Sequence, residues 1–216
     1  MKTLFRLFKK KDHAETGIGT MIIFIAMVLV AGIAASVLIQ TSSRLQSQAM
    51  TTGEETTSEV ATGLEVSSVQ GHVSGGTIDR LAITIRARSG SQDIDLSTAV
   101  LELSDGVNKH ILSYDTTPVY ATAPAIGGIF LTDVFTLTAP KFGLIELQDA
   151  DGSSSGATPV INRGDKIVVT VNVTATFGTL TERTEVTGSI YPEEGAPGII
   201  SFRTPSTYTD IVLNLQ

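Results

Sequence analysis

An uncharged apolar run, residues 17–39, constrains this chain more than any other feature of its sequence. The run follows Lys9, Lys10 and Lys11 and opens as Gly-Ile-Gly-Thr. At about 1.5 Å per residue, a helix of this length measures about 35 Å, which is enough to cross a bilayer and too long for an ordinary secretory signal. Basic residues before the run predict an N-terminus in the cytoplasm and a C-terminal domain outside the membrane.

Charge is divided unevenly along the chain. Five of its 15 basic side chains precede residue 15, whereas only one of its 22 acidic side chains does. The acidic remainder offers no basic stripe for phosphates, which argues against a nucleic-acid partner. The chain has no cysteine, which excludes thiolate catalysis, disulfides and Cys-based metal sites.

The sequence predicts an α+β protein with one long helix and one β domain. Residues 40–50 contain no Gly or Pro, so we expect the helix to cover residues 15–50, after a basic leader at 1–14. Residues 51–59 change to polar and β-branched types and predict a linker. Beyond it the helical period disappears, and residues 60–216 are predicted to form the head domain.

The head shows the apolar–polar alternation of half-buried strands. Leu81, Ile83 and Ile85 share one face of the predicted strand 78–88, and Val169 and Val171 share a face of 167–177. A turn at Gly178 is expected to pair 167–177 with 179–190. Other predicted strands are 99–104, 108–114, 134–139, 199–202 and 211–215. About eight to ten strands with such turn spacing indicate an all-β, Ig-like sandwich or barrel.

Residues 16–41 closely resemble the N-terminus of archaeal flagellins, the archaellins: a basic leader, Gly-Ile-Gly-Thr, then Phe-Ile-Ala-Met-Val-Leu-Val-Ala. Similar segments in the head are 95–97, 164–166 and 192–216. The resemblance implies a structural subunit of the archaellum, the filament that archaea rotate for swimming. It implies an extracellular polymer of this chain with itself or other archaellins, no cofactor, and motor proteins that supply the torque.

The resemblance also implies proteolytic processing. In this family a prepilin-type aspartic peptidase removes the leader at the cytoplasmic face of the membrane, two residues before Gly-Ile-Gly-Thr. On this chain the cut falls between Ala14 and Glu15, near Lys10, Lys11 and Gly17. Ala14 stands where the family usually has Gly and is small enough for the same pocket. Asp12 and His13 replace the usual basic pair.

Small and apolar residues of the run suit close packing between helices. Ala26, Ala31 and Gly32 belong to a series of small side chains that let helices approach. Seven positions, called here the packing positions, follow the 4-3 spacing of a bundled core: Ile18, Ile22, Ile25, Leu29, Gly32, Ser36 and Ile39. An ordinary lipid-facing anchor is equally apolar on every side, and only the family resemblance favours a polymerising helix.

Few residues of the head suggest chemistry. Asn172-Val173-Thr174 is an N-glycosylation sequon on the predicted outward face of a strand, and an unmodified Asn is an equally good interpretation. Asp93 and Asp95 form one acidic pair, and Asp149 and Asp151 resemble part of a calcium loop. Neither supplies the six to eight oxygens of calcium, so we expect solvated carboxylates and no metal site.

No catalytic group is apparent. His13, His72 and His110 are scattered, and no nucleophile elbow or phosphate-binding loop is present, so we expect no enzyme. Two alternatives to an archaellin remain. An archaeal adhesion pilin shares the helix and its processing, whereas a permanently anchored surface-binding protein would keep Met1.

Overall fold

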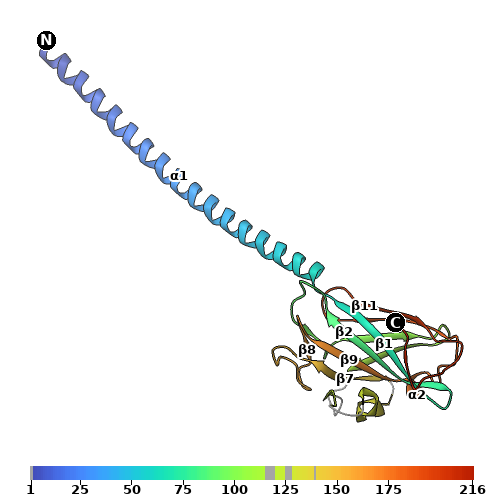
Figure 1. Ribbon diagram of the computed structural model, residues 1–216. Helices are drawn as coiled ribbons and strands as arrows, with labels where there is room; N and C mark the ends of the chain where they lie inside the picture. The colour runs from blue at the N-terminus through green and yellow to red at the C-terminus, as the bar shows by residue number, and fades with distance from the viewer. Residues whose placement is uncertain (1, 115–119, 125–127, 139) are drawn as a thin grey trace. The chain divides into compact units, whose positions relative to one another are not determined.

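The computed structural model describes residues 2–114, 120–124, 128–138 and 140–216, with side chains from residue 16 onward except that of Tyr120. The chain divides into two compact units, Met1–Glu54 and Glu55–Gln216. Figure 1 shows one long helix and a separate β domain, as the sequence predicts. The head domain is the part of the second unit that follows the helix.

Helix α1 covers Lys2–Ala61 and is continuous through residues 51–59, the predicted linker. Gly53 is the one residue of this segment with a strong cost in a helix, and the others are exposed Thr and Glu and a partly buried Ser, which a helix tolerates. The division between the two units nevertheless falls inside this segment, at Glu54 and Glu55.

The head is built mainly from one sheet. Among the described residues ten strands belong to it, in the order β11-β10-β4-β5-β7-β9-β2-β1-β12, with β6 paired to β7. Neighbours are antiparallel except for the pairs that β7 makes with β5 and β6. The strands are β1 Leu64–Ser74, β2 Thr77–Ala87, β4 Val100–Ser104, β5 Lys109–Tyr114, β6 Tyr120–Thr122, β7 Lys141–Gln148, β9 Lys166–Asn172, β10 Glu185–Tyr191, β11 Gly198–Arg203 and β12 Val212–Asn214. A two-stranded sheet joins β3 (Ile94–Asp95) to β8 (Val160–Ile161).

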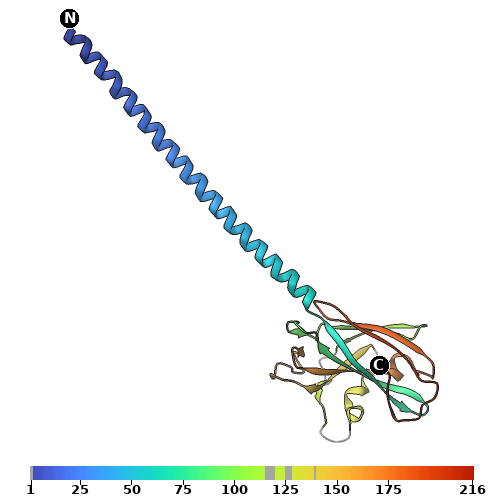
Figure 2. The ribbon, with the colours of Figure 1, turned by 45° about the horizontal axis from the view of Figure 1, so that its top comes forward.

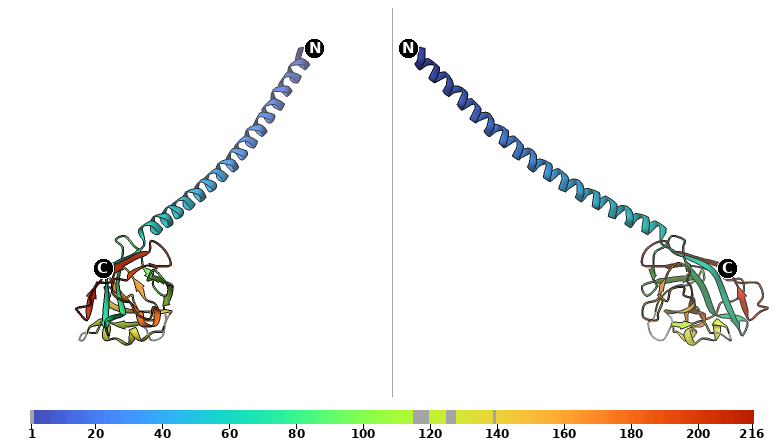
Figure 3. Two further views of the ribbon diagram at one scale, coloured as in Figure 1. Left: turned by 90° about the vertical axis from the view of Figure 1, so that its right-hand side faces the viewer. Right: turned by 60° about the vertical axis from the view of Figure 1, so that its left-hand side comes forward.

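The large sheet curls until its two ends meet. The Leu64 amide at the start of β1 donates to Ala196 O, just before β11, at 3.0 Å. The Ser201 amide of β11 donates to the side chain of Gln216, beyond β12, at 3.0 Å. Figures 2 and 3 show the strands of the head wrapped around a common interior. The fold is therefore a curled β domain of the predicted sandwich or barrel kind.

Alternation along the central strands fills this interior. Leu81, Ile83 and Ile85 of β2 are fully buried, together with Val169 and Val171 of the adjacent β9. A smaller cluster lies on the other face of the sheet, where two short 3-10 helices, η1 (Ile129–Leu131) and η2 (Asp133–Thr136), cover Ala82 and Val168. At Ala82 and Val168 these strands are thus buried on both faces, which explains why apolar residues interrupt the alternation there.

Three strand predictions fail locally. Residues 134–136 lie in η2, where the adjacent Val134 and Phe135 are both buried, and residue 139 lies outside the described part. Strand β9 ends at Asn172, whose side chain caps the short helix α2 (Val173–Thr176). The predicted 167–177/179–190 hairpin is wrong, because β10 pairs with β4 and β11, and β9 pairs with β2 and β7.

Candidate assembly helix and polar sites of the head

The apolar run of α1 is exposed on every side within the single chain. Consecutive residues such as Ile22, Ile23 and Phe24 are each at least 60% exposed, so no face of the helix is covered. Residues 16–61 contain the one described helix that is long and apolar enough to cross a membrane. An apolar surface of this extent requires lipid or other protein chains around it.

The packing positions have no core within the chain. Ile18, Ile22 and Leu29 are about three-fifths exposed, and Gly32 and Ser36 are exposed as well. A Cβ placed at Gly32 would meet nothing within 4 Å. Among the described residues, these side chains therefore pack against no other part of the chain. Any packing partner must come from outside it.

The hydroxyl groups of α1 suit an apolar environment. Thr20 donates to Gly17 O at 2.9 Å, Thr41 to Leu38 O at 3.0 Å and Thr51 to Ser47 O at 3.1 Å. Each hydroxyl is satisfied by the helix itself, so it can leave water without losing its hydrogen bond. The side chains of Lys10, Lys11, His13, Ala14 and Glu15, which concern the predicted cleavage, lie outside the described part.

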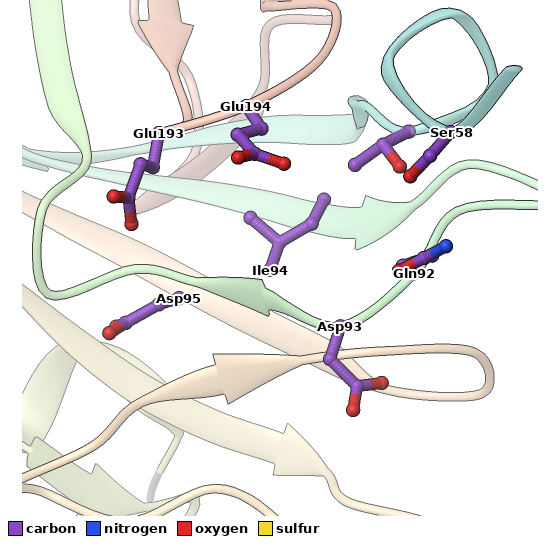
Figure 4. Close-up of a pocket in the computed structure, with 8 residues that line it drawn as sticks. Ser58, Gln92, Asp93, Ile94, Asp95, Glu193 and Glu194 are labelled. Atoms are coloured by element: carbon purple, nitrogen blue, oxygen red, sulfur yellow. The ribbon is translucent and has the colours of Figure 1, made fainter. Parts of the chain in front are cut away.

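An acidic pocket of about 230 Å³ lies on the second unit (Figure 4). Asp93 and Asp95, predicted as solvated, contribute to it together with Glu193 and Glu194. Asp95 accepts the Ser97 amide at 2.8 Å, and the other three carboxylates are exposed. The pocket's other lining residues are Ser58, Thr62, Gln92 and Ile94.

A second acidic group gathers at the loops after β7 and β8. Asp149, Asp151 and Asp165 each place one oxygen within 4.8 Å of the others. Asp165 is the buried member, and the sequence prediction missed it because it lies outside the Asp-Ala-Asp-Gly fragment. Three carboxylates could hold a cation only if carbonyl groups, amides or water completed the six to eight oxygens of a calcium site.

Backbone and side-chain donors already surround these carboxylates. Asp165 accepts the amides of Ala150 and Asn162, both at 2.9 Å. Asp149 accepts the Gly152 amide at 2.7 Å. Hydrogen bonds from Ser153 and Asn162 hold the pKa of the Asp151 carboxyl below its usual value. The group therefore ties the two loops together, whether or not a cation joins it.

Asn172 does not present the free outward amide that the sequon suggested. Its Oδ1 accepts the Ala175 amide at 3.1 Å, and its Nδ2 donates to Leu137 O at 2.9 Å. Both ends of the side-chain amide thus have structural partners in the folded head.

The two described histidines also make structural contacts. His72 Nδ1 lies 2.6 Å from Asp79 Oδ1, and the His72 ring packs against Phe130. His110 meets the ring of Phe177 edge to face at 4.9 Å between centroids. The two rings have separate partners, and neither belongs to an acidic group described above.

These features define a class of protein in which one apolar helix, uncovered by its own chain, precedes a curled β head. The family model for archaeal-type flagellin matches residues 14–202. The chain belongs to this family.

Relatives match along nearly the whole length. Flagellin B2 of Methanocaldococcus jannaschii is 46% identical over 97% of this chain and 98% of its own. Flagellin B3 of Methanococcus voltae is 38% identical over 99% of this chain and 100% of its own.

Two solved structures share the fold. The crystal structure of archaeal flagellin FlaB1 from M. jannaschii covers 72% of this chain and 98% of its own, with a TM-score of 0.66 and 38% identity. The match to the archaeal flagellum of Methanospirillum hungatei covers 92% of this chain and 98% of the solved chain, with a TM-score of 0.59. At 15% identity, the second likeness concerns the fold alone.

Proposed function

We propose that this chain is a structural subunit of the archaellum filament, assembled with other archaellins through α1. The observation that carries the proposal is the helix itself: its apolar side chains are exposed all round, and the chain belongs to a flagellin family. Burying them yields about 25 cal/mol per Å² before the cost of ordering. The adhesion pilin and the anchored binding protein are not favoured, because nearly full-length relatives are flagellins.

Assembly places the packing positions against neighbouring copies. Ile22, Ile25 and Leu29 supply apolar bulk, and Gly32 and Ser36 allow helix axes to approach closely. Contacts between different faces of successive copies do not close, so they generate an open helical polymer. The heads then form its outer layer, and their acidic surfaces keep filaments apart in solution.

The precursor is proposed to insert in the cytoplasmic membrane before assembly. The apolar run spans the bilayer with the basic leader inside. A prepilin-type aspartic peptidase then cuts between Ala14 and Glu15, which removes the leader and frees α1 for the filament. Rotation and assembly depend on separate motor and membrane proteins of the archaellum, and the chain itself has a structural role and no catalytic one.

Asn172 is the proposed acceptor of an N-linked glycan. Its Nδ2 donates one of its two hydrogens to Leu137 O in the folded head, and a glycan would replace the other. Mass spectrometry of the tryptic peptide, with Asn172→Gln as control, tests whether Asn172 is modified. An unmodified peptide from mature filaments would contradict it.

Shearing filaments from cells and measuring the mass of their subunits tests processing and assembly together. The proposal predicts sheared protein that begins at Glu15. Intact subunits that begin at Met1 in the filament would refute the cleavage. A chain that stays in the membrane fraction and never enters sheared material would refute the filament role.

A further inference from the structure

Arg44 is the one Lys or Arg between Lys11 and Arg80. Its side chain is exposed on α1, and among the described residues no salt bridge involves it. A shallow hollow surrounds it on the helix surface, lined by Ile39, Gln40, Ser43, Ser47 and Gln48. The Arg44 guanidinium therefore lies, without a charged partner in the described part of the chain, in the mostly polar segment 40–48, which follows the apolar run.

An isolated cation is costly at this place once α1 is packed in a filament. A guanidinium does not lose its proton at any physiological pH, so it cannot become neutral on burial. A charge removed from water needs a partner of opposite sign. The apolar run that precedes it supplies none, because residues 17–39 contain no acid.

The next charged residue along α1 is Glu54, also exposed and ten residues further on. On a helix this spacing is about 15 Å along the axis and about 80° around it. Arg44 and Glu54 of one copy are therefore too far apart to pair with each other. The two side chains lie on different faces of the helix. An open, head-to-tail polymer requires this, because each contact joins two different surfaces of the subunit.

We propose that Arg44 of one copy pairs with Glu54 of a neighbouring copy, and that this ion pair sets an axial stagger of about 15 Å between their helices. The inference rests on the proposed filament function and names the partner, a second copy of this chain. Glu55 and Glu59 follow on the same helix and add negative charge toward this end.

The apolar contacts alone leave this stagger weakly defined. Ile and Leu side chains pack acceptably at several offsets, whereas Arg44 meets an acid of the neighbouring helix only at the few offsets that bring it to Glu54, Glu55 or Glu59. Buried polar pairs fix the register of coiled coils in this way, at some cost in stability. Arg44 would thus give specificity to a contact whose strength comes from the apolar run.

Thiol cross-linking tests the stagger directly, because the chain has no cysteine of its own. Ser47→Cys and Thr57→Cys lie three residues beyond Arg44 and Glu54, so they keep the same ten-residue spacing and leave the ion pair intact. The full chain with both changes is produced in an archaeal host that lacks its own filament protein. A bismaleimide that spans about 8 Å cannot join two sites about 15 Å apart on one helix, so it bridges them only between copies. Cross-linking of sheared filaments is expected to give a ladder of dimers, trimers and higher species on a denaturing gel.

The matched control moves one site by seven residues. Gln40→Cys with Thr57→Cys requires a stagger of about 26 Å, and each single variant lacks its second site, so none of them should give a ladder. A ladder from the control pair and none from Ser47→Cys with Thr57→Cys would overturn the proposed stagger.

Charge exchange provides a second test for variants that assemble poorly. Arg44→Glu alone should reduce filaments per cell by about tenfold or more, because it sets acid against acid. Arg44→Glu with Glu54→Arg should restore them to within about twofold of wild type. Arg88→Glu, the same charge reversal at an exposed position of the head, is the control and should leave filaments intact.

The outcomes separate this inference from the proposed function. Normal filaments from Arg44→Glu, or no rescue by the double variant, would refute the ion pair. Filaments from the wild-type chain in the same experiment would still support the proposed function. Loss of the Arg44→Glu chain from the membrane fraction would assign Arg44 to lipid headgroups instead. Absence of wild-type filaments would refute the proposed function itself.

Discussion

Asp165 shows how carboxylates of the head serve its own backbone. It is 2% exposed, and its two oxygens accept amides from two loops, those of Ala150 and Asn162. Asp105 plays a similar part in the turn between β4 and β5, where it accepts the amides of Val107 and Asn108. Both residues lie beside turn glycines, in loops that must satisfy their own amides.

Replacing Asp165 by Asn should destabilise the head by about 1–3 kcal/mol, because one charged acceptor is lost at a buried site. Urea unfolding of the purified chain in detergent, followed by circular dichroism, measures this loss. Asp93→Asn, at an exposed carboxylate, is the control and should change stability by less than about 0.5 kcal/mol. Equal effects of the two variants would contradict the structural role of Asp165.

Asp105 should make stability depend on pH. The amides of Asn108 and Val107 hold the pKa of its carboxyl below the ordinary 3.8. A lowered pKa means that this contribution is complete above pH 3.8 and is lost as the pH falls through the folded-state value. Asp105→Ala should therefore be less stable than wild type at neutral pH, by less than about 1 kcal/mol because the site is only partly buried and solvent screens its charge.

The difference between wild type and Asp105→Ala should shrink as the pH falls below 3.8. Thermal unfolding between pH 2 and pH 7 would show the two curves converging at the acid end. A difference that stayed constant over this range would show that the Asp105 charge adds no stability.

At the scale of elements, the pairing of β10 with β4 depends on the absence of a side chain at Gly188. A Cβ there would lie 2.2 Å from Glu102 O and 2.7 Å from a methyl group of Leu103. Gly188→Ala should therefore force the two strands apart and cost about 1–3 kcal/mol.

Gly53→Ala is the matched control, because a Cβ on this exposed helical residue meets nothing within 4 Å. It should be neutral or stabilising by up to about 1 kcal/mol. Calorimetry measures the unfolding temperature and enthalpy of both variants and of the wild type. A Gly188→Ala chain as stable as wild type would show that β10 and β4 are not in close contact.

The sequence predicted α1 and about half of the strands, where the signals are local, and it did not predict β1 or β7. The length of the apolar run predicts α1, and alternation predicts β2, β4, β5, β11 and β12. The errors lie where two local signals compete. Residues 167–177 alternate throughout, but Asn172 is also a good helix cap, and the cap ends the strand.

Long-range pairings were not predictable from local signals. Gly178 suggested a hairpin, yet β10 crosses to β4, a partner far away in the sequence. Asp165 was missed for the same reason, since only the meeting of two loops brings it to Asp149 and Asp151. The packing positions remain a prediction, because their contacts lie between chains.

At the scale of the whole molecule, α1 has to suit two environments in succession. The same side chains face lipid in the proposed precursor and sister helices in the filament. Gly32 distinguishes the two, because a large side chain there is tolerated by lipid but not by a close helix neighbour. A larger side chain at Gly32 should not affect the head, because a Cβ placed there would meet no atom within 4 Å.

Gly32→Leu should therefore leave membrane insertion and the stability of the head unchanged, while filaments per cell fall by about tenfold or more. Electron microscopy of negatively stained cells counts the filaments, and immunoblots of membranes confirm the chain. Ile33→Leu, which preserves volume and polarity, is the control and should assemble normally. Normal filaments from Gly32→Leu would place Gly32 outside the helix contacts.

Helical reconstruction of sheared filaments by electron cryo-microscopy is the decisive test of assembly through α1. We expect an inner bundle of α1 helices, with the packing positions in contact between copies and the β heads outside. We also expect density for each subunit to begin at Glu15. Filaments without this chain, or with α1 exposed and the heads in the centre, would contradict assembly through α1.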